Sequence, residues 1–282
     1  MKNVLVPTDF SAESHHAFGV ALRIAQRAGG SLTLLHVVEM PEGASFITSG
    51  GTAQAGGDGM GRLFAMKLLE VTKQRMSKLI AEAHQKAPGV VVNDVVLDDR
   101  IGPAILQTIE THYIDLVVVG AQGHTAMNRL LMGSNTERLV RLAPCPVLAV
   151  KHADPDFNPE TIVFPSDFTA EADRAAPLLQ QVQRLFPDAR LRLLHVTPDH
   201  TAPNATVRME TFAERHGLRN TVVDIFVDAN ELTGIDQFVQ QTEACLVVLP
   251  THGRTGLSRY LNPSVAERVA VSVLPPVLTF RI

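Results

Sequence analysis

The 282-residue chain contains 45% hydrophobic and 19% charged residues, a composition that supports sizeable buried cores and excludes an intrinsically disordered protein. Its formal net charge of −4 gives no broad attraction for a polyanion, so binding to DNA or RNA is disfavoured. The chain enters a strand pattern at residues 2–6, which leaves no room for a secretion signal, and no apolar run is long enough to span a membrane. We therefore expect a cytoplasmic protein that has neither a nucleic-acid nor a membrane partner.

The sequence does not predict a metal site. The two cysteines, Cys145 and Cys245, each precede an apolar run and have no second cysteine or histidine at ligand spacing. We expect both to be buried thiols in a reducing compartment. The pair His15-His16 lies on the surface of a predicted helix, without cysteine or acidic residues at ligand spacing, so a metal site there is disfavoured.

The predicted elements of the first half alternate between strands and helices. Strands are expected near residues 3–7, 31–37, 90–97, 115–120 and 146–150, and helices near 13–28, 62–86, 103–112 and 134–142. Gly29-Gly30 ends the first helix. The unbroken apolar run at 116–119 suits a strand that is buried on both faces, which indicates a parallel sheet covered by helices.

The same pattern occurs a second time, in the same order, about 158 residues further along the chain. Three segments carry the repeat: Val4–Ser11 returns as Ile162–Thr169, Leu34–Val37 as Leu193–Val196, and Asp115–Gly120 as Cys245–Pro250. This duplication predicts two α/β domains, residues 1–151 and 160–282, joined by a polar, proline-containing linker. A Gly- and Ser-rich stretch at 43–61 has no counterpart in the second copy, and it is either a mobile loop over the first site or a disordered insertion.

A glycine-rich motif follows the buried strand of the first copy. It reads G-x2-G-x9-G-S, from Gly120 and Gly123 to Gly133-Ser134. Glycines allow a backbone to fold its amides around phosphate oxygens. Ser134 and Glu137 form a capping box, which places the positive end of a helix dipole at the same point. The motif therefore predicts an anion site at the carboxyl end of a parallel strand, where α/β sheets bind ligands.

These motifs resemble the universal stress protein family, in its tandem and ATP-binding form. The resemblance covers both copies, and it implies two Rossmann-like domains of the adenine-nucleotide alpha hydrolase type, each a five-stranded parallel sheet with helices on both faces. It also implies ATP bound with Mg²⁺ or Mn²⁺, adenosine near the first two strands, and phosphates at the glycines. Carried over by position, the ATP-binding residues are Pro7, Thr8, Asp9, Val37, Gly120, Gln122, Gly123, Gly133, Ser134 and Asn135.

Several of these residues also have simpler interpretations. Asp9, followed by Ser11, could serve only to cap the first helix, and Ser134 is a plausible cap as well. His36 and His195 end equivalent strands, and we favour structural roles over ligand binding for both.

The second copy departs from the glycine motif. Its equivalent begins Pro250-Thr251-His252-Gly253 and ends Pro263-Ser264, so that two of the three glycines are prolines. Proline lacks the N–H and adds bulk where a backbone must approach phosphate. We expect the second domain to have lost the triphosphate cradle while keeping Asp167.

The leading functional hypothesis is a nucleotide-dependent regulator in a stress response, a role that comes from the resemblance alone. A slow ATPase is the first alternative, although no acid–base pair is positioned for catalysis and no lysine lies in the glycine segment. The second alternative is that the protein binds another small molecule, with its pocket in the degenerate second domain. The apolar terminal strands, 146–150 and 277–280, are expected to join the domains as a pseudo-two-fold pair. The protein partner, and the formation of a homodimer, remain open.

Overall fold

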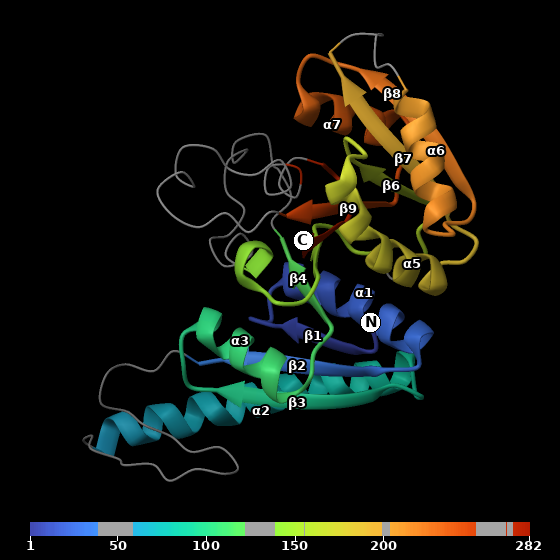
Figure 1. Cartoon of the computed structure of the whole chain (residues 1–282). Helices are drawn as coiled ribbons and strands as arrows, with labels where there is room; N and C mark the ends of the chain where they lie inside the picture. Colours follow the sequence, from blue (N-terminus) through green and yellow to red (C-terminus); the bar gives the residue numbers. More distant parts are fainter. Residues whose placement is uncertain (39–58, 122–138, 155, 199–203, 252–268, 270–272) are drawn as a thin grey trace.

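The computed structural model describes residues 1–38, 59–121, 139–154, 156–198, 204–251, 269 and 273–282. Within them, ten strands form one continuous sheet in the order β3-β2-β1-β4-β5-β10-β9-β6-β7-β8. Figure 1 shows two lobes, the first in blue and green and the second in yellow to red. Both chain termini lie between the lobes.

The first lobe contains five parallel strands: β1 (Asn3–Pro7), β2 (Ser31–Val37), β3 (Val91–Leu97), β4 (Leu116–Gly120) and β5 (Val147–Val150). Its described helices are α1 (Ala12–Ala28), α2 (Gly59–Lys86) and α3 (Ile101–Thr111). The predicted strands and the first helix are confirmed to within about two residues. Helix α2 begins at Gly59, so the stretch expected to be irregular up to residue 61 ends earlier.

The second lobe repeats this order with β6 (Thr161–Pro165), β7 (Arg190–Thr197), β8 (Thr221–Val227), β9 (Leu246–Thr251) and β10 (Val277–Arg281). Its helical elements are η1 (Ala170–Ala175), α5 (Ala176–Leu185), α6 (Ala205–Arg215) and α7 (Glu231–Gln241). The counterpart of α1 is thus a short 3₁₀ helix followed by an α-helix.

The two lobes join through their last strands. Strands β5 and β10 pair antiparallel, with Leu278 opposite Leu148 and Thr279 opposite Val147. Leu148 and Leu278 hold equivalent places in the two copies, so this pair marks the pseudo-two-fold axis. The pairing covers two edges that would otherwise be exposed, and it confirms the predicted arrangement.

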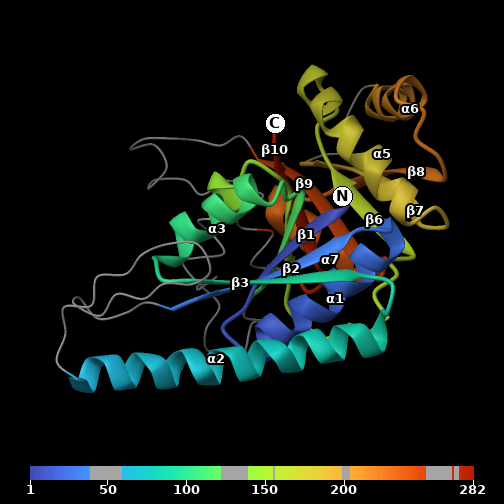
Figure 2. The same cartoon turned by 90° about the horizontal axis from the view of Figure 1, so that it is seen from below.

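Helices cover both faces of the sheet, and each face has its own apolar core. On one face, α1, α2, α5 and α6 pack on side chains such as Val4 and Ile162. On the other, α3 and α7 pack on side chains such as Leu5 and Val163. Figure 2 shows α1 and α2 on one side of the first-lobe strands and α3 on the other. Among the described residues, no helix is long and apolar enough to cross a membrane.

The segment between the lobes is anchored more firmly than its polar sequence indicated. Phe157 is 1% exposed and packs edge-on against Phe186 of the second lobe, with ring centroids 5.6 Å apart. The guanidinium of Arg27, at the end of α1, lies over the same Phe186 ring, 5.3 Å from its centroid. The linker therefore contributes an aromatic side chain to the core shared by the two lobes.

Candidate functional site

The strand order places the candidate site of the first lobe at the point where the chain reverses direction across the sheet. From β1 the chain proceeds outward to β2 and β3, and then returns to β4 on the other side of β1. Crevices at the carboxyl ends of such strands are the usual ligand sites of open α/β sheets. Asp9 follows β1, and Gly120 ends β4, so both lie at this crevice.

The loop after β1 is fixed by a hydrogen bond of its backbone to β2 and by one that the Thr8 side chain accepts. The Thr8 N–H donates to the Leu35 carbonyl at 2.8 Å, and the Phe10 N–H donates to Thr8 Oγ1 at 3.1 Å. Phe10 adopts φ 64°, a left-handed conformation that is rare for a bulky residue and is often found at functional sites. This network holds the backbone of residues 7–10 in a defined shape at the strand end.

Asp9 does not cap helix α1. The N-cap is Ser11, whose hydroxyl oxygen accepts from the Ser14 N–H at 3.2 Å. Asp9 instead accepts from the Ser11 N–H at 2.9 Å, in a turn that precedes the helix. Partial burial raises the pKa of Asp9, but hydrogen bonds from Ser11 and Ser14 outweigh it, so the pKa lies below its ordinary value. The side chain is exposed and ionised at neutral pH.

His36 has a structural contact at the end of β2. Its Nδ1 lies 2.7 Å from the Thr8 carbonyl oxygen, and its ring packs against Phe10, with centroids 4.5 Å apart and planes tilted by 39°. The Arg75 guanidinium of α2 lies over the same Phe10 ring, at 5.4 Å. These contacts link α2 to the strand ends. Sequence reasoning assigned no role to Arg75 or Phe10, because the contact joins residues that are far apart in the chain.

Gly120 has a packing reason to be glycine. A Cβ added to it would lie 2.4 Å from the Glu13 carbonyl oxygen and 2.8 Å from the Ser14 nitrogen, in the first turn of α1. Only glycine lets the helix approach the end of β4 this closely. The residue was predicted to contact phosphate, and the structure shows that helix packing alone also requires it.

The described part of the site therefore brings together Pro7, Thr8, Asp9, Val37 and Gly120 at neighbouring strand ends. The rest of the glycine motif lies outside the described residues: Gln122, Gly123, Gly133, Ser134 and Asn135. The stretch at 43–58 and Pro263 also lie outside them. Among the described residues, no group of three potential metal-ligating side chains is present.

The second lobe keeps the geometry of the first strand-end loop. The Ser166 N–H donates to the Leu194 carbonyl at 2.9 Å, and the Phe168 N–H donates to Ser166 Oγ at 3.1 Å. Phe168 has φ 55°, and His195 Nδ1 lies 3.1 Å from the Ser166 carbonyl oxygen. The contacts of His36 and His195 fit the structural roles favoured from the sequence.

Pro250 occupies the position in β9 that Gly120 occupies in β4, because each pairs with the fourth residue of the last strand in its lobe. Helix α1 packs closely on β1 and β4, whereas neither η1 nor α5 packs comparably on β9. Pro250 therefore stands at a strand end that neither η1 nor α5 approaches as closely as α1 approaches the end of β4.

A pocket of about 230 Å³ opens at the strand ends of the second lobe. Its lining is rich in carboxylates and comes from the ends of β6, β7 and β8 and the start of α7: Pro165, Ser166, Asp167, His195, Val196, Pro198, Asp228, Ala229 and Glu231. Burial and the charge of Asp167 raise the pKa of Glu231, and His195 partly offsets them. The pocket is thus acidic, unlike a site built for phosphate. Neither Asp228 nor Glu231 was found from the sequence, since both follow a strand without a motif.

Both cysteines are free, and each is half-buried instead of fully buried as expected. They precede the strands β5 and β9. Burial, and next the charge of Asp115, raise the pKa of Cys145 to about 11.

A sequence model of the universal stress protein family matches residues 1–151 and 213–281, which is well over half of the chain. The chain belongs to the universal stress protein family. A Staphylococcus aureus protein whose name places it in this family is 28% identical over 165 residues, covering 56% of the chain and 90% of that protein.

Solved structures support the fold of this universal stress protein over its whole length. The crystal structure of a universal stress protein from Archaeoglobus fulgidus aligns with a TM-score of 0.71 and 19% identity, covering 99% of the chain and 96% of that protein. The cytoplasmic domain of a prokaryotic cation chloride cotransporter aligns with a TM-score of 0.56 and 13% identity, covering 98% and 94%. At these identities, the alignments establish the two-lobed fold and nothing further.

Proposed function

We propose that the first lobe binds ATP and that its occupancy regulates the protein in a stress response. The observation that supports this most strongly is the position of Asp9 and Gly120 on either side of the point where the strand order reverses. The glycine motif continues directly from β4 at this crevice. Membership of the universal stress protein family supports the stress role.

The described residues fit the adenosine end of ATP. Asp9 is ionised and exposed, so its carboxylate can accept hydrogen bonds from ribose hydroxyls or from the adenine amine. Val37 is half-buried at the end of β2, next to β1, and can offer an apolar surface to the base. The phosphates would lie against the amides of residues 120–123 and 133–135. A Mg²⁺ or Mn²⁺ ion would be held mainly by phosphate oxygens.

Two substitutions test this site by calorimetric titration with Mg-ATP. Gly133→Pro introduces the residue that the second copy has at this position, and it should abolish binding by removing an amide donor and adding bulk. Asp9→Asn keeps the acceptor for the Ser11 N–H but removes the charge, and it should weaken binding about tenfold.

Gly89→Ala is the matched control, because an added Cβ there meets no atom within 4 Å. Its ATP affinity should equal that of the wild type. Unchanged affinity in a folded Gly133→Pro variant would remove the assignment, and so would a wild-type protein that fails to bind ATP at millimolar concentration. A turnover near the enzyme median of about 10 s⁻¹ would instead favour the ATPase alternative.

A second candidate function is supported by the acidic pocket of the second lobe. Asp167, Asp228 and Glu231 line it together, and three carboxylates would repel a triphosphate. Its volume of about 230 Å³ suits a small neutral or cationic molecule, or a nucleoside held near Asp167 and Val196. Titrating the Gly133→Pro variant with adenosine and with ATP distinguishes a ligand of the second-lobe pocket from ATP bound in the first lobe. This candidate predicts that only adenosine binds, and that Asp167→Asn weakens its binding.

A further inference from the structure

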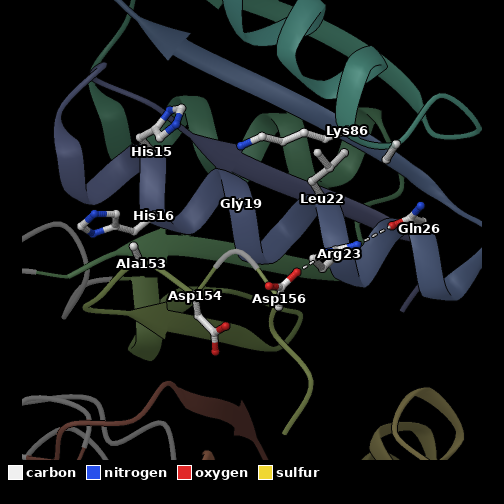
Figure 3. Close-up of a pocket in the computed structure, with 11 residues that line it drawn as sticks. His15, His16, Gly19, Leu22, Arg23, Gln26, Lys86, Ala153, Asp154 and Asp156 are labelled. Carbon is white, nitrogen blue, oxygen red and sulfur yellow. Dashed lines mark hydrogen bonds and ion pairs between the residues drawn. The ribbon is translucent and has the colours of Figure 1, made fainter.

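A cavity of about 460 Å³ lies between α1, the end of α2 and the segment that follows β5. Its lysine and its arginine are paired within the chain. Figure 3 shows Arg23 directed toward Asp156, and their nearest nitrogen and oxygen are 2.5 Å apart. Lys86 Nζ donates to Glu82 Oε1 at 2.7 Å, and His15 Nε2 lies 3.2 Å from the same oxygen. The basic residues at this end of α2 are therefore neutralised by nearby carboxylates.

The outer face of α2 is different, because its lysines have few acidic neighbours. Lys73 and Lys78 are exposed, and within the described structure neither forms an ion pair. Lys67 pairs with Glu70 of the same helix at 3.4 Å, and both of these side chains are exposed, so the pair contributes little. Basic residues outnumber acidic ones from Lys67 to the end of the helix, although the whole chain has a net charge of −4. The outer face of α2 is thus basic.

An apolar side chain lies between two of these lysines. Val71 is 37% exposed. Lys67 precedes it by four residues and Lys78 follows it by seven, so the three side chains lie on one face of the helix. Figure 2 shows α2 along the outer side of the first lobe. We call Lys67, Val71 and Lys78 the α2 stripe.

The outermost strand of the second lobe exposes apolar side chains. Strand β8 ends the sheet, and in it Ile225 is 42% exposed and Val227 is 37% exposed. By strand register these two residues correspond to Val96 and Asp98 of the first lobe. Val96 is half-buried, and Asp98 places a charge at the open edge. The second lobe thus has an apolar residue where the first lobe protects its edge with a carboxylate.

Carboxylates follow this apolar strip directly. Asp228 comes after Val227 and lines the acidic pocket together with Asp167 and Glu231. In the part of the chain that the structure describes, no lysine or arginine lines this pocket. Its volume of about 230 Å³ admits the end of a lysine side chain, and carboxylates accept the hydrogen bonds that an ammonium donates. We call Ile225, Val227, Asp228, Glu231 and Asp167 the β8 patch.

The α2 stripe and the β8 patch of one chain cannot meet. Helix α2 packs on β3, and β3 and β8 are the two outermost strands of the ten-stranded sheet. Figures 1 and 2 show α2 and β8 at opposite ends of the molecule. A contact between the two surfaces therefore requires a second copy of the chain. If each copy offers its stripe to the patch of the other, a two-fold axis relates the copies and the assembly closes as a dimer.

We propose that two copies of this chain form a dimer in which the α2 stripe of each copy docks on the β8 patch of the other. Val71 packs on Ile225 and Val227, and the lysine ammoniums pair with the carboxylates of the acidic pocket. Charge complementarity selects a second copy as the occupant, because the chain itself carries both halves of the match. Docking covers the acidic pocket, so the dimer and a small ligand in that pocket exclude each other. The interface uses no residue of the proposed ATP site, and either can fail without the other.

Sedimentation velocity of the full-length protein tests this dimer. The wild type should pass from monomer to dimer between about 1 and 500 µM, and added NaCl should weaken the dimer because it screens the charges. Lys78→Glu and Glu231→Lys should each lower the dimer affinity about tenfold or more, because each brings like charges together. Lys2→Glu is the matched control, since it reverses an exposed charge outside both surfaces and should dimerise like the wild type.

Mixing the two charge-reversal variants gives the decisive result. In the mixed dimer one contact joins the two reversed charges and the other keeps the wild-type residues, so mixing should recover the wild-type affinity. Far-UV circular dichroism checks that each variant is folded, and Lys78→Gln with Glu231→Gln replaces a variant that is not. The proposal is overturned if the wild type stays monomeric at about 500 µM, if the charge changes leave the dimer intact, or if mixing does not recover it.

Discussion

Lys151 offers the sharpest test of how the two lobes meet. It directly follows β5, is only 4% exposed, and donates a hydrogen bond from Nζ to the Val273 carbonyl of the second lobe. Burial lowers its pKa to about 8, although the charge of Asp236 partly opposes this. The folded pKa lies about 2.5 units below the ordinary value of 10.5. Holding this charge at neutral pH therefore lowers the free energy of unfolding by roughly 3 kcal/mol.

Lys151→Met removes both the charge and the hydrogen bond to Val273. The lost bond costs about 1 kcal/mol, so the variant should be more stable than the wild type by roughly 2 kcal/mol at neutral pH. Because the folded pKa is below the unfolded one, the unfolded state binds more protons between pH 8 and 10.5. Stability due to this group thus rises with pH in that window. Between about pH 7.5 and 9 the wild type should gain roughly 1 kcal/mol relative to Lys151→Met.

Urea unfolding followed by far-UV circular dichroism measures this difference, since the chain has no tryptophan to report by fluorescence. Lys67→Met is the control, because the Lys67 side chain is 74% exposed and its removal should leave the pH dependence of the wild type unchanged. A stability difference between the wild type and Lys151→Met that stays constant from about pH 7.5 to 9 would refute the reasoning.

Three further predictions concern stability. Phe157→Ala should lower the free energy of unfolding, measured in urea, by about 3–5 kcal/mol, because it removes the buried ring that packs against Phe186 of the second lobe. A decrease below about 1 kcal/mol would contradict that role. Gly120→Ala should lower the free energy of unfolding by about 1–3 kcal/mol, because the added Cβ clashes with the backbone of Glu13. The control Gly89→Ala should change it by no more than about 0.5 kcal/mol. Equal melting temperatures for the two variants would contradict the clash. The folded pKa of Cys145 exceeds its unfolded value, so stability falls between pH 9 and about 11, and Cys145→Ala should show a shallower fall there.

The sequence predicted the sheet well because its signals were local and repeated. The buried run at 116–119 predicted a strand covered on both faces, and all of these residues are buried in β4. The two apolar terminal strands predicted the junction of the lobes, because the residues that pair, 147–149 and 277–279, carry no charge that would protect an open edge. The duplication strengthened these predictions, because a strand predicted in one copy could be checked against the equivalent residues of the other copy.

What the sequence missed depends on contacts between distant segments. Phe157 looked like part of a polar linker, since its partner Phe186 directly follows helix α5 of the other domain. The 3₁₀ helix η1 had no signal of its own, because its counterpart in the first copy is a regular helix. At the site, Asp9 was placed correctly at the strand end. Its hydrogen bond to the Ser11 N–H, and the packing role of Gly120, required coordinates.

The number of ATP molecules bound per chain tests the central claim most directly. Pro250 and Pro263 stand where the first copy has Gly120 and Gly133, so the second lobe should lose several hydrogen bonds to phosphate. Each pair of such bonds corresponds to about two or more decades of affinity. Calorimetry of the wild type should therefore return one ATP per chain, and none for Gly133→Pro. Two equivalent ATP sites per chain would contradict the account, because they would show that the prolines leave the second cradle intact.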